Sequence, residues 1–343
     1  MDGDNVATDI QEYVRARLWF PAEVADATYP LLIAYVLLAA VVRISDLFEA
    51  IPYLYFHGAP GSGKSEAGNL LAGLTRGASS VNISKAALFR WLDQNKGQFL
   101  FIDEASRLSS ADYRDVMNAG YRRGGKVYRC DGPSHTPVSF EVFGPKAFAA
   151  NRGIPIGAIE SRCVLVEFTE APMTFVPEPG NADQEGRLRQ QAEQWASNHL
   201  EDLRAAEARW RHDTSTFSSQ RMRQIWAPLF AIGEVAGLLE PLQQYAEAHQ
   251  HLRNIRHTLA VRDLLDPVLA ELADYAKAQG YPGAVPFKVI RAFVEARLDG
   301  ISPSGKAIAQ ALVAGGWTAS HTRDGTFYLP PRKGPLSRLF GGR

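Results

Sequence analysis

The sequence predicts an α/β fold in which helices cover both faces of a parallel sheet. From residue 51 to about residue 170, short apolar runs of strand length alternate with segments whose apolar residues recur at helical spacing. At the first change from strand to helix, residues 58–65 read Gly-Ala-Pro-Gly-Ser-Gly-Lys-Ser, which fits the pattern of a phosphate-binding loop. Together these observations predict the sheet of a phosphate-loop NTPase.

The octet lies between a predicted strand and a predicted helix, which is the position of a phosphate-binding loop. The apolar run 51–56 predicts a buried strand before it, and leucines at helical spacing in 65–74 predict a helix after it. Glycines let successive N–H groups turn towards phosphate oxygens, and the helix start adds its positive end. The residues expected to bind the nucleotide are Gly58, Ala59, Pro60, Gly61, Ser62, Gly63, Lys64 and Ser65.

Within the loop, Lys64 is expected to reach the β- and γ-phosphates, and the Ser65 hydroxyl to coordinate Mg²⁺. The cofactors predicted are therefore ATP and Mg²⁺. The alternative for the octet is a glycine-rich turn that serves only the structure.

Two acids follow the apolar run 99–102. A central strand would carry Asp103 and Glu104 to its carboxyl end, where ligands of α/β proteins bind. Asp103 is expected to hold the Mg²⁺ shell, as the Walker-B aspartate does. Glu104 is placed to orient and deprotonate the attacking water, which predicts hydrolysis. The alternative is an acidic pair in a solvated loop or a helix cap.

Two further polar residues flank predicted strands. Asn151 ends the strand-like segment 143–150, where its amide can hydrogen-bond the attacking water or the γ-phosphate; a strand-end turn is the alternative. Arg162 precedes the strand-like segment 163–168 and is expected to supply charge to a neighbouring subunit's nucleotide. A surface salt bridge is the alternative for Arg162, and Arg152 competes for the same role.

Composition narrows the class of protein. The 343 residues include 37 Lys plus Arg and 37 Asp plus Glu, so any nucleic-acid surface must be local. Two cysteines indicate neither a disulfide framework nor a four-cysteine metal site, which fits a reducing cytosol. The polar start of the chain is not a secretory signal. The apolar stretch 31–42 is shorter than a membrane span and predicts a buried helix, so no membrane partner and a cytoplasmic location are expected.

Proline and glycine clusters divide the chain. Residues 171–180 hold three prolines and a glycine, and 280–283 are Gly-Tyr-Pro-Gly. After the second break, two helices and two short strands joined through Arg323-Asp-Gly325 give the outline of a winged helix-turn-helix. The predicted parts are a helical collar, a nucleotide-binding core, a linker with a helical lid, a winged helix and a basic tail, at residues 1–50, 51–170, 171–279, 280–330 and 331–343.

This order of motifs resembles an AAA+ ATPase. More narrowly, it is similar to the helicase-like ATPases of uncharacterised function that accompany primase–polymerases in plasmids, prophages and other mobile elements. The similarity covers about residues 30–250, and the stretches that carry it are 87–92, 118–125, 142–147 and 221–232. It implies that Arg221 is a sensor 2 residue, that subunits form a ring, expected to be a hexamer, and that a primase–polymerase is a separate partner.

A basic segment precedes Asn151. Residues 126–130 and 138–142 can pair as a hairpin across a turn that begins at Asp131, and the hairpin resembles the one that superfamily-three helicases project into the ring channel. Tyr121 and Tyr128 would suit the bases of a single strand. The residues expected to contact DNA are Arg122, Arg123, Lys126, Arg129 and His135. The alternative for Arg122 and Arg123 is pairing with a neighbouring subunit's acids.

The function predicted from these features is an ATP-hydrolysing AAA+ motor, a ring-forming helicase or translocase that acts on DNA, single-stranded DNA above all, in the replication of a mobile element. An excess of cations after residue 284 supports a nucleic-acid face on the winged helix, although such modules also bind proteins. The alternative function is a nucleotide-switched regulatory or assembly ATPase that acts on a protein partner in transposition, defence or partition.

Overall fold

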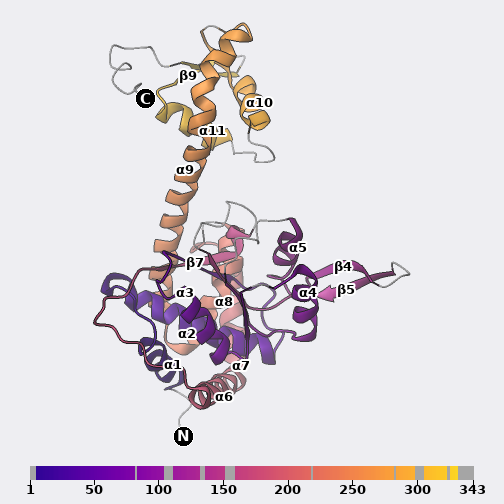
Figure 1. Ribbon diagram of the computed structural model, residues 1–343, viewed down its shortest axis with the longest axis vertical. Coiled ribbons are helices and arrows are strands. Elements are labelled where there is room, and N and C mark those ends of the chain that lie inside the picture. The colour runs from indigo at the N-terminus through magenta and orange to yellow at the C-terminus, as the bar shows by residue number, and fades with distance from the viewer. Residues whose placement is uncertain are drawn as a thin grey trace. The chain divides into compact units, whose positions relative to one another are not determined.

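The computed structural model (Figure 1) describes residues 5–81, 83–103, 111–131, 136–150, 159–217, 219–281, 283–297, 305–322 and 325–330. Its contacts divide the chain into two compact units, Met1–His249 and Gln250–Arg343. The five-part division expected from the sequence stays a prediction.

A five-stranded parallel sheet lies at the centre of the first unit. Its strands follow the order β2-β3-β6-β1-β7, and each neighbouring pair is parallel. The strands are β1 (Tyr53–Gly58), β2 (Ala78–Ser80), β3 (Leu100–Ile102), β6 (Lys146–Ala150) and β7 (Cys163–Phe168). The predicted parallel sheet is confirmed, and its carboxyl ends share one edge.

Helices occupy most of the rest of this unit. They are α1 (Val6–Arg15), α2 (Ala22–Ile44), α3 (Lys64–Leu74), α4 (Lys85–Gln94), α5 (Ala111–Ala119), the 3₁₀ turn η3 (Glu160–Arg162), α6 (Ala182–Asn198), α7 (Leu200–His212) and α8 (Gln220–Ala236). The following helix, α9 (Leu239–Ala278), contains residues of both units.

The strands alternate their side chains between two apolar cores. Along β1, Leu54 and Phe56 belong to the core that contains buried residues of α2, α3, α6 and α8. Tyr53 and Tyr55 belong to the core that contains buried residues of α4 and α5. This period of two is what a strand produces when both faces of its sheet are covered.

Helix α2 is buried on nearly all sides. It has 23 residues and is the one helix in the described part of the chain that is long and apolar enough to cross a membrane. The argument that this segment is too short for a membrane span is therefore wrong, because the helix begins nine residues before Leu31. Of its most apolar window, 83% is buried within the fold, as in a core helix.

A two-stranded antiparallel hairpin follows α5. Its strands are β4 (Lys126–Asp131) and β5 (Thr136–Glu141), and they pair from Lys126↔Glu141 to Asp131↔Thr136. The predicted hairpin is confirmed, and its turn lies outside the described residues. Figure 1 shows the strands beside α4, where the rings of Phe89 and Phe140 lie 4.6 Å apart.

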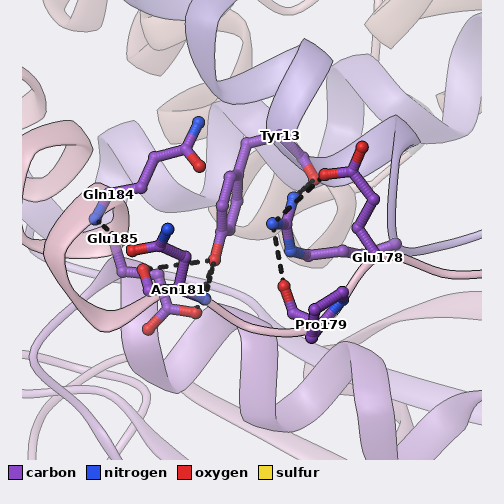
Figure 2. A network of polar contacts seen from close by, with 7 residues as sticks. Tyr13, Glu178, Pro179, Asn181, Gln184 and Glu185 are labelled. Carbon is purple, nitrogen blue, oxygen red and sulfur yellow. Dashed lines mark hydrogen bonds and ion pairs between the residues drawn. The ribbon is translucent and has the colours of Figure 1, made fainter.

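The segment between β7 and α6 is anchored on α1 and on the turn that follows it. The Tyr13 hydroxyl donates to Glu185 at 2.8 Å, and Arg17 donates to the carbonyl oxygen of Pro179 at 3.0 Å. Figure 2 shows Tyr13 with Asn181 and Glu185 on one side and Pro179 on the other. These contacts hold a proline-rich segment, which has no helix or strand between residues 169 and 181, against the start of the chain.

The second unit contains a small sheet and three helical segments. After α9 come β8 (Val285–Pro286), α10 (Phe287–Arg297), α11 (Gly305–Ala314), β9 (Thr318–Thr322) and β10 (Gly325–Leu329). The sheet order is β8-β10-β9, and both pairings are antiparallel. The predicted succession of two helices and a hairpin is confirmed, whereas its function as a winged helix stays a prediction.

Candidate functional site

The predicted phosphate loop connects β1 to α3 at the carboxyl edge of the sheet. Gly58 leaves no room for a side chain, since a Cβ there would lie 2.3 Å from the carbonyl oxygen of Phe168 on the neighbouring strand. Gly63 has φ +95° and is the N-cap of α3, a conformation that favours glycine. The loop therefore turns sharply into a helix whose first N–H groups have no partner within the helix.

Lys64 is the first residue of α3, and its side chain folds back over the loop. Only 6% of the residue is exposed. Its Nζ donates to the carbonyl oxygens of Gly58 at 2.9 Å and Ala59 at 2.7 Å, and lies 3.4 Å from the Ser62 hydroxyl. Burial lowers the pKa of Lys64, while the nearby Asp103 carboxylate raises it. The ammonium group thus lies inside the loop, where a phosphate would replace the carbonyl oxygens.

Asp103 follows β3 at the same edge of the sheet. Its backbone N–H donates to the carbonyl oxygen of Ser80 at 2.9 Å, which continues the pairing of β3 with β2. The structure thereby brings Asp103 near Lys64, as the two motifs predict. Glu104, Asn151 and Arg152 lie outside the described residues, so their predicted roles stay predictions.

The residues at this edge fit a magnesium nucleotide. A hydroxyl at Ser65 and a carboxylate at Asp103 are the hard oxygen donors that Mg²⁺ prefers, and Mg²⁺ on a nucleotide uses few protein ligands. Ser65 is exposed in the first turn of α3. The described residues contain no group of three or more His, Cys, Asp or Glu that would hold a metal by itself. The donor set therefore suits an ion delivered with phosphates.

The two predicted arginines lie together at the opposite edge of the sheet. Arg162 comes directly before β7, whose first residue pairs with Tyr53 at the start of β1. The Cζ atoms of Arg162 and Arg221 lie 4.6 and 4.8 Å from the centroid of the Tyr121 ring. Burial lowers the pKa of Arg162, and the Arg221 charge lowers it further. Neither the spacing of these residues nor the resemblance predicted this cluster.

A pocket of about 610 Å³ adjoins the arginine cluster. It is lined by Glu49, Asn118, Tyr121, Arg122, Arg123 and Arg162, among others. Tyr121 is only 6% exposed, so the expectation that its ring receives a base is wrong. Tyr121 belongs to the apolar core that contains buried residues of α4 and α5.

The described residues of the predicted DNA-contact set differ in their exposure and in their partners within the chain. Arg122 is exposed. Arg123 is held within the chain, where it forms an ion pair with Asp46 and donates to the carbonyl oxygens of Ser45 and Phe48. Its predicted DNA contact stays a prediction, and His135 lies outside the described residues.

Two of the predicted DNA-contact residues, Lys126 and Arg129, lie on opposite faces of the hairpin. Residues 126 and 129 are three apart, so Lys126 and Arg129 point to opposite faces of β4. Lys126 is exposed and lies 3.9 Å from the Glu141 carboxylate, whereas Arg129 lies over the Phe89 ring of α4 at 5.6 Å. Tyr128 is 65% exposed and shares the face of Lys126. The face of β4 that carries Lys126 and Tyr128 is therefore the face of the hairpin that is exposed to solvent.

A buried lysine was not among the expected site residues. Lys146 begins β6 and has no exposed surface. Its Nζ donates to the carbonyl oxygens of Val142 at 2.8 Å, Gly144 at 2.9 Å and Gly120 at 3.4 Å. It therefore ties the segment before β6 to the end of α5. Burial lowers its pKa to about 7.

Comparison with known proteins supports the fold. No protein-family model and no curated protein matches the chain. A solved structure described as the active helicase Cch of SCCmec type IV aligns with a TM-score of 0.50 and 13% identity, covering 96% of this chain and 70% of the other. Two structures of the NrS-1 C-terminal region align at 14% and 13% identity over 96% of this chain and 74% of theirs, with TM-scores of 0.33 and 0.31. The alignment with the first of these structures supports the α/β fold of the chain.

Proposed function

We propose that this chain is an AAA+ ATPase whose subunits form a ring, expected to be a hexamer, and move along or remodel DNA. The observation that carries the proposal is the geometry of the loop at the carboxyl edge of the parallel sheet, where Lys64 Nζ donates to the carbonyl oxygens of Gly58 and Ala59 and Asp103 follows β3 at the same edge. A lysine inside a glycine-rich loop, an acid on a nearby strand and the start of a helix form a site for the phosphates of a nucleotide.

Each residue has a distinct part in hydrolysis. Lys64 and the N–H groups of the loop bind the β- and γ-phosphates, and Ser65 with Asp103 would hold Mg²⁺, which would offset part of the charge of the phosphates. Glu104 takes a proton from the attacking water, and Asn151 orients that water or the γ-phosphate. Arg162 supplies charge from a second subunit, because it lies at the opposite edge of the sheet from its own loop.

The test of hydrolysis is the Glu104→Gln variant. It should bind ATP like the wild type but lose at least about a hundredfold in turnover, because only the water-activating step changes. Asp103→Asn serves as the comparison and should raise the Mg²⁺ concentration needed for half-maximal activity. A Gln variant with nearly wild-type turnover would show that Glu104 is not the base.

DNA is the proposed substrate of the motor, and single-stranded DNA the preferred form. The exposed face of the hairpin carries Lys126 and Tyr128, a cation and an aromatic ring, as single-strand sites do. The second unit, with two helices and a hairpin, is proposed to be a winged helix that adds a DNA contact. In this proposal the ring works in the cytoplasm in the replication of a mobile element, beside a separate primase–polymerase.

One observation favours a different function. Arg123 and Arg129 are engaged within the chain, and Lys126 lies beside Glu141, so the hairpin presents less free positive charge than its sequence indicates. A nucleotide-switched ATPase that acts on a protein partner, in transposition, defence or partition, needs no such charge. Single-stranded DNA should stimulate hydrolysis by a translocase severalfold. If DNA has no effect and a protein partner stimulates hydrolysis, the switch is the function.

A further inference from the structure

Two lysines from separate segments share one carboxylate at the base of the hairpin. Lys96 follows α4, and its Nζ lies 2.9 Å from one carboxylate oxygen of Glu141. Lys126 begins β4, and its Nζ lies 3.9 Å from the other oxygen of the same carboxylate. The side chains of Lys96, Lys126 and Glu141 are 61%, 42% and 41% exposed. All three charges are therefore accessible to a ligand from solvent.

The three charged groups lie on the face of the hairpin that carries Tyr128. Lys126 pairs directly with Glu141 across the hairpin, so their side chains project from the same face. Tyr128 is two residues beyond Lys126 on β4 and has the same orientation, roughly 7 Å further along the strand. Lys96 reaches this face from outside the hairpin, through its contact with Glu141. An exposed aromatic ring and two ammonium groups are thus neighbours on one surface.

The backbone of Glu141 is fixed independently of its carboxylate. The Glu141 N–H donates to the Asp93 carboxylate of α4 at 2.9 Å, which ties the end of β5 to the helix. Within the described part of the chain, the Glu141 carboxylate pairs with Lys96 and Lys126. The hydrogen bond to Glu141 and the charge of Glu141 raise the pKa of Lys96, with a smaller contribution from Asp93. A change of the Glu141 side chain would therefore leave the attachment of β5 to α4 in place.

One carboxylate does not satisfy two ammonium groups. Each ammonium has three N–H donors, and the 3.9 Å between Lys126 and Glu141 is longer than a hydrogen bond. Ion pairs between exposed side chains are weak, because water and salt screen the charges. A phosphate oxygen can therefore replace the carboxylate beside these lysines with little loss of free energy. The Tyr128 ring offers a stacking surface for a base next to that phosphate, as in proteins that bind single strands.

We propose that Lys96 and Lys126 together bind a backbone phosphate of single-stranded DNA, and that Glu141 occupies their site until the phosphate displaces it. The inference rests on the proposed DNA substrate and deepens it. It adds Lys96, which lies outside the hairpin, to the DNA contact, and it makes Glu141 an internal competitor that lowers the affinity for DNA. The positive charge of the hairpin face becomes available when the carboxylate moves away.

Removing the charge of the carboxylate tests the competition. Glu141→Gln keeps the size of the side chain and should bind a fluorescent oligothymidylate about three- to tenfold more tightly at low salt. The gain should shrink as the salt concentration rises, because salt screens the competing charge. Glu201→Gln is the matched control, since Glu201 is an exposed acid paired with Arg204 and the change adds the same net charge. Affinity of Glu141→Gln no higher than that of Glu201→Gln overturns the inference.

Variants of the lysines show whether the competition takes place at their site. Lys96→Ala should weaken binding of the same oligonucleotide and make its salt dependence shallower by about one unit of slope, as the loss of one phosphate contact does. In a variant that carries both Lys96→Ala and Lys126→Ala, Glu141→Gln should raise the affinity no more than Glu201→Gln does. A gain that persists without the two lysines, or wild-type binding by Lys96→Ala, overturns the inference.

The remaining outcomes separate this inference from the function on which it rests. A wild-type protein that binds oligothymidylate, with Glu141→Gln no tighter, overturns the inference and leaves the DNA substrate in place. Failure of the wild type and of Glu141→Gln to bind at low salt overturns both. Binding of poly-glutamate in place of the oligonucleotide, strengthened by Glu141→Gln, overturns the inference and assigns the surface to an acidic protein partner. Thermal melting of each variant confirms that it is folded, since Glu141 keeps its backbone bond to Asp93.

Discussion

The carboxylate of Asp103 lies close enough to the ammonium group of Lys64 to raise its pKa, although burial lowers that pKa by more. Asp103 follows β3, and Lys64 begins α3, the helix after β1. In the sheet, β6 lies between β3 and β1. The ammonium group of Lys64 donates hydrogen bonds to carbonyl oxygens of its own loop. The site is therefore preorganised around a positive charge before a nucleotide arrives.

Lys64→Ala should weaken ATP binding by about 10- to 100-fold, since a hydrogen bond to a charged group contributes about 1.5–3 kcal/mol. Titration with a fluorescent ATP analogue measures the change. Lys96→Ala is the matched control, because Lys96 is an exposed lysine paired with Glu141 and should leave ATP affinity unchanged. Equal affinity of the Lys64 variant and the wild type would show that the loop does not bind phosphate through this side chain.

Gly58→Ala should destabilise the first unit and weaken nucleotide binding together. Its Cβ would meet the Phe168 carbonyl oxygen at 2.3 Å and the Ser62 hydroxyl at 2.7 Å, so β1 and β7 must separate or the loop must move. We expect a loss of about 1–3 kcal/mol in the free energy of unfolding. Gly283→Ala is the control, because nothing lies within 4 Å of a Cβ there. Denaturant unfolding that ranks the two variants equally would contradict the close approach.

The sequence was enough to predict the parallel sheet, the loop and the hairpin, because each depends on local pattern. The apolar run 51–56 and the octet that follows it needed no knowledge of distant segments. The hairpin followed from two strand-like runs around a turn, although the second observed strand, Thr136–Glu141, begins and ends before the expected segment 138–142. These parts of the fold were therefore predictable with nearly the observed bounds.

The arginine cluster could not be predicted in this way. Arg162, Arg221 and Tyr121 are far apart in the sequence and meet only after α8 packs near the start of β7. The burial of Lys146 also depends on tertiary contacts, since its carbonyl partners belong to the segments that end α5 and precede β6. A lysine in a strand gives no local signal that it will be enclosed.

Lys146 should make stability depend on pH in the alkaline range. Burial lowers its folded-state pKa to about 7 from an unfolded value of 10.5, so between these values the unfolded chain binds the extra proton. The free energy of unfolding of the wild type, relative to Lys146→Met, should therefore rise between pH 7 and pH 10, by up to about 1.4 kcal/mol per pH unit. Urea unfolding of both proteins across this range measures it. A constant difference would mean that the carbonyl oxygens keep the lysine protonated.

The hairpin variants should separate DNA binding from folding, because β4 points its cations to opposite faces. Lys126→Ala should weaken single-stranded DNA binding and make its salt dependence shallower by about one unit of slope. Tyr128→Ala, on the same face, should cost about 1–3 kcal/mol of binding through lost stacking. Arg129→Ala should instead lower the melting temperature, since Arg129 packs on Phe89. Fluorescence anisotropy at several salt concentrations, with thermal melting of each variant, gives both readouts. If Arg129→Ala weakened DNA binding more than Lys126→Ala without loss of stability, the face against α4 would be the DNA face, and the exposed tyrosine would have another role.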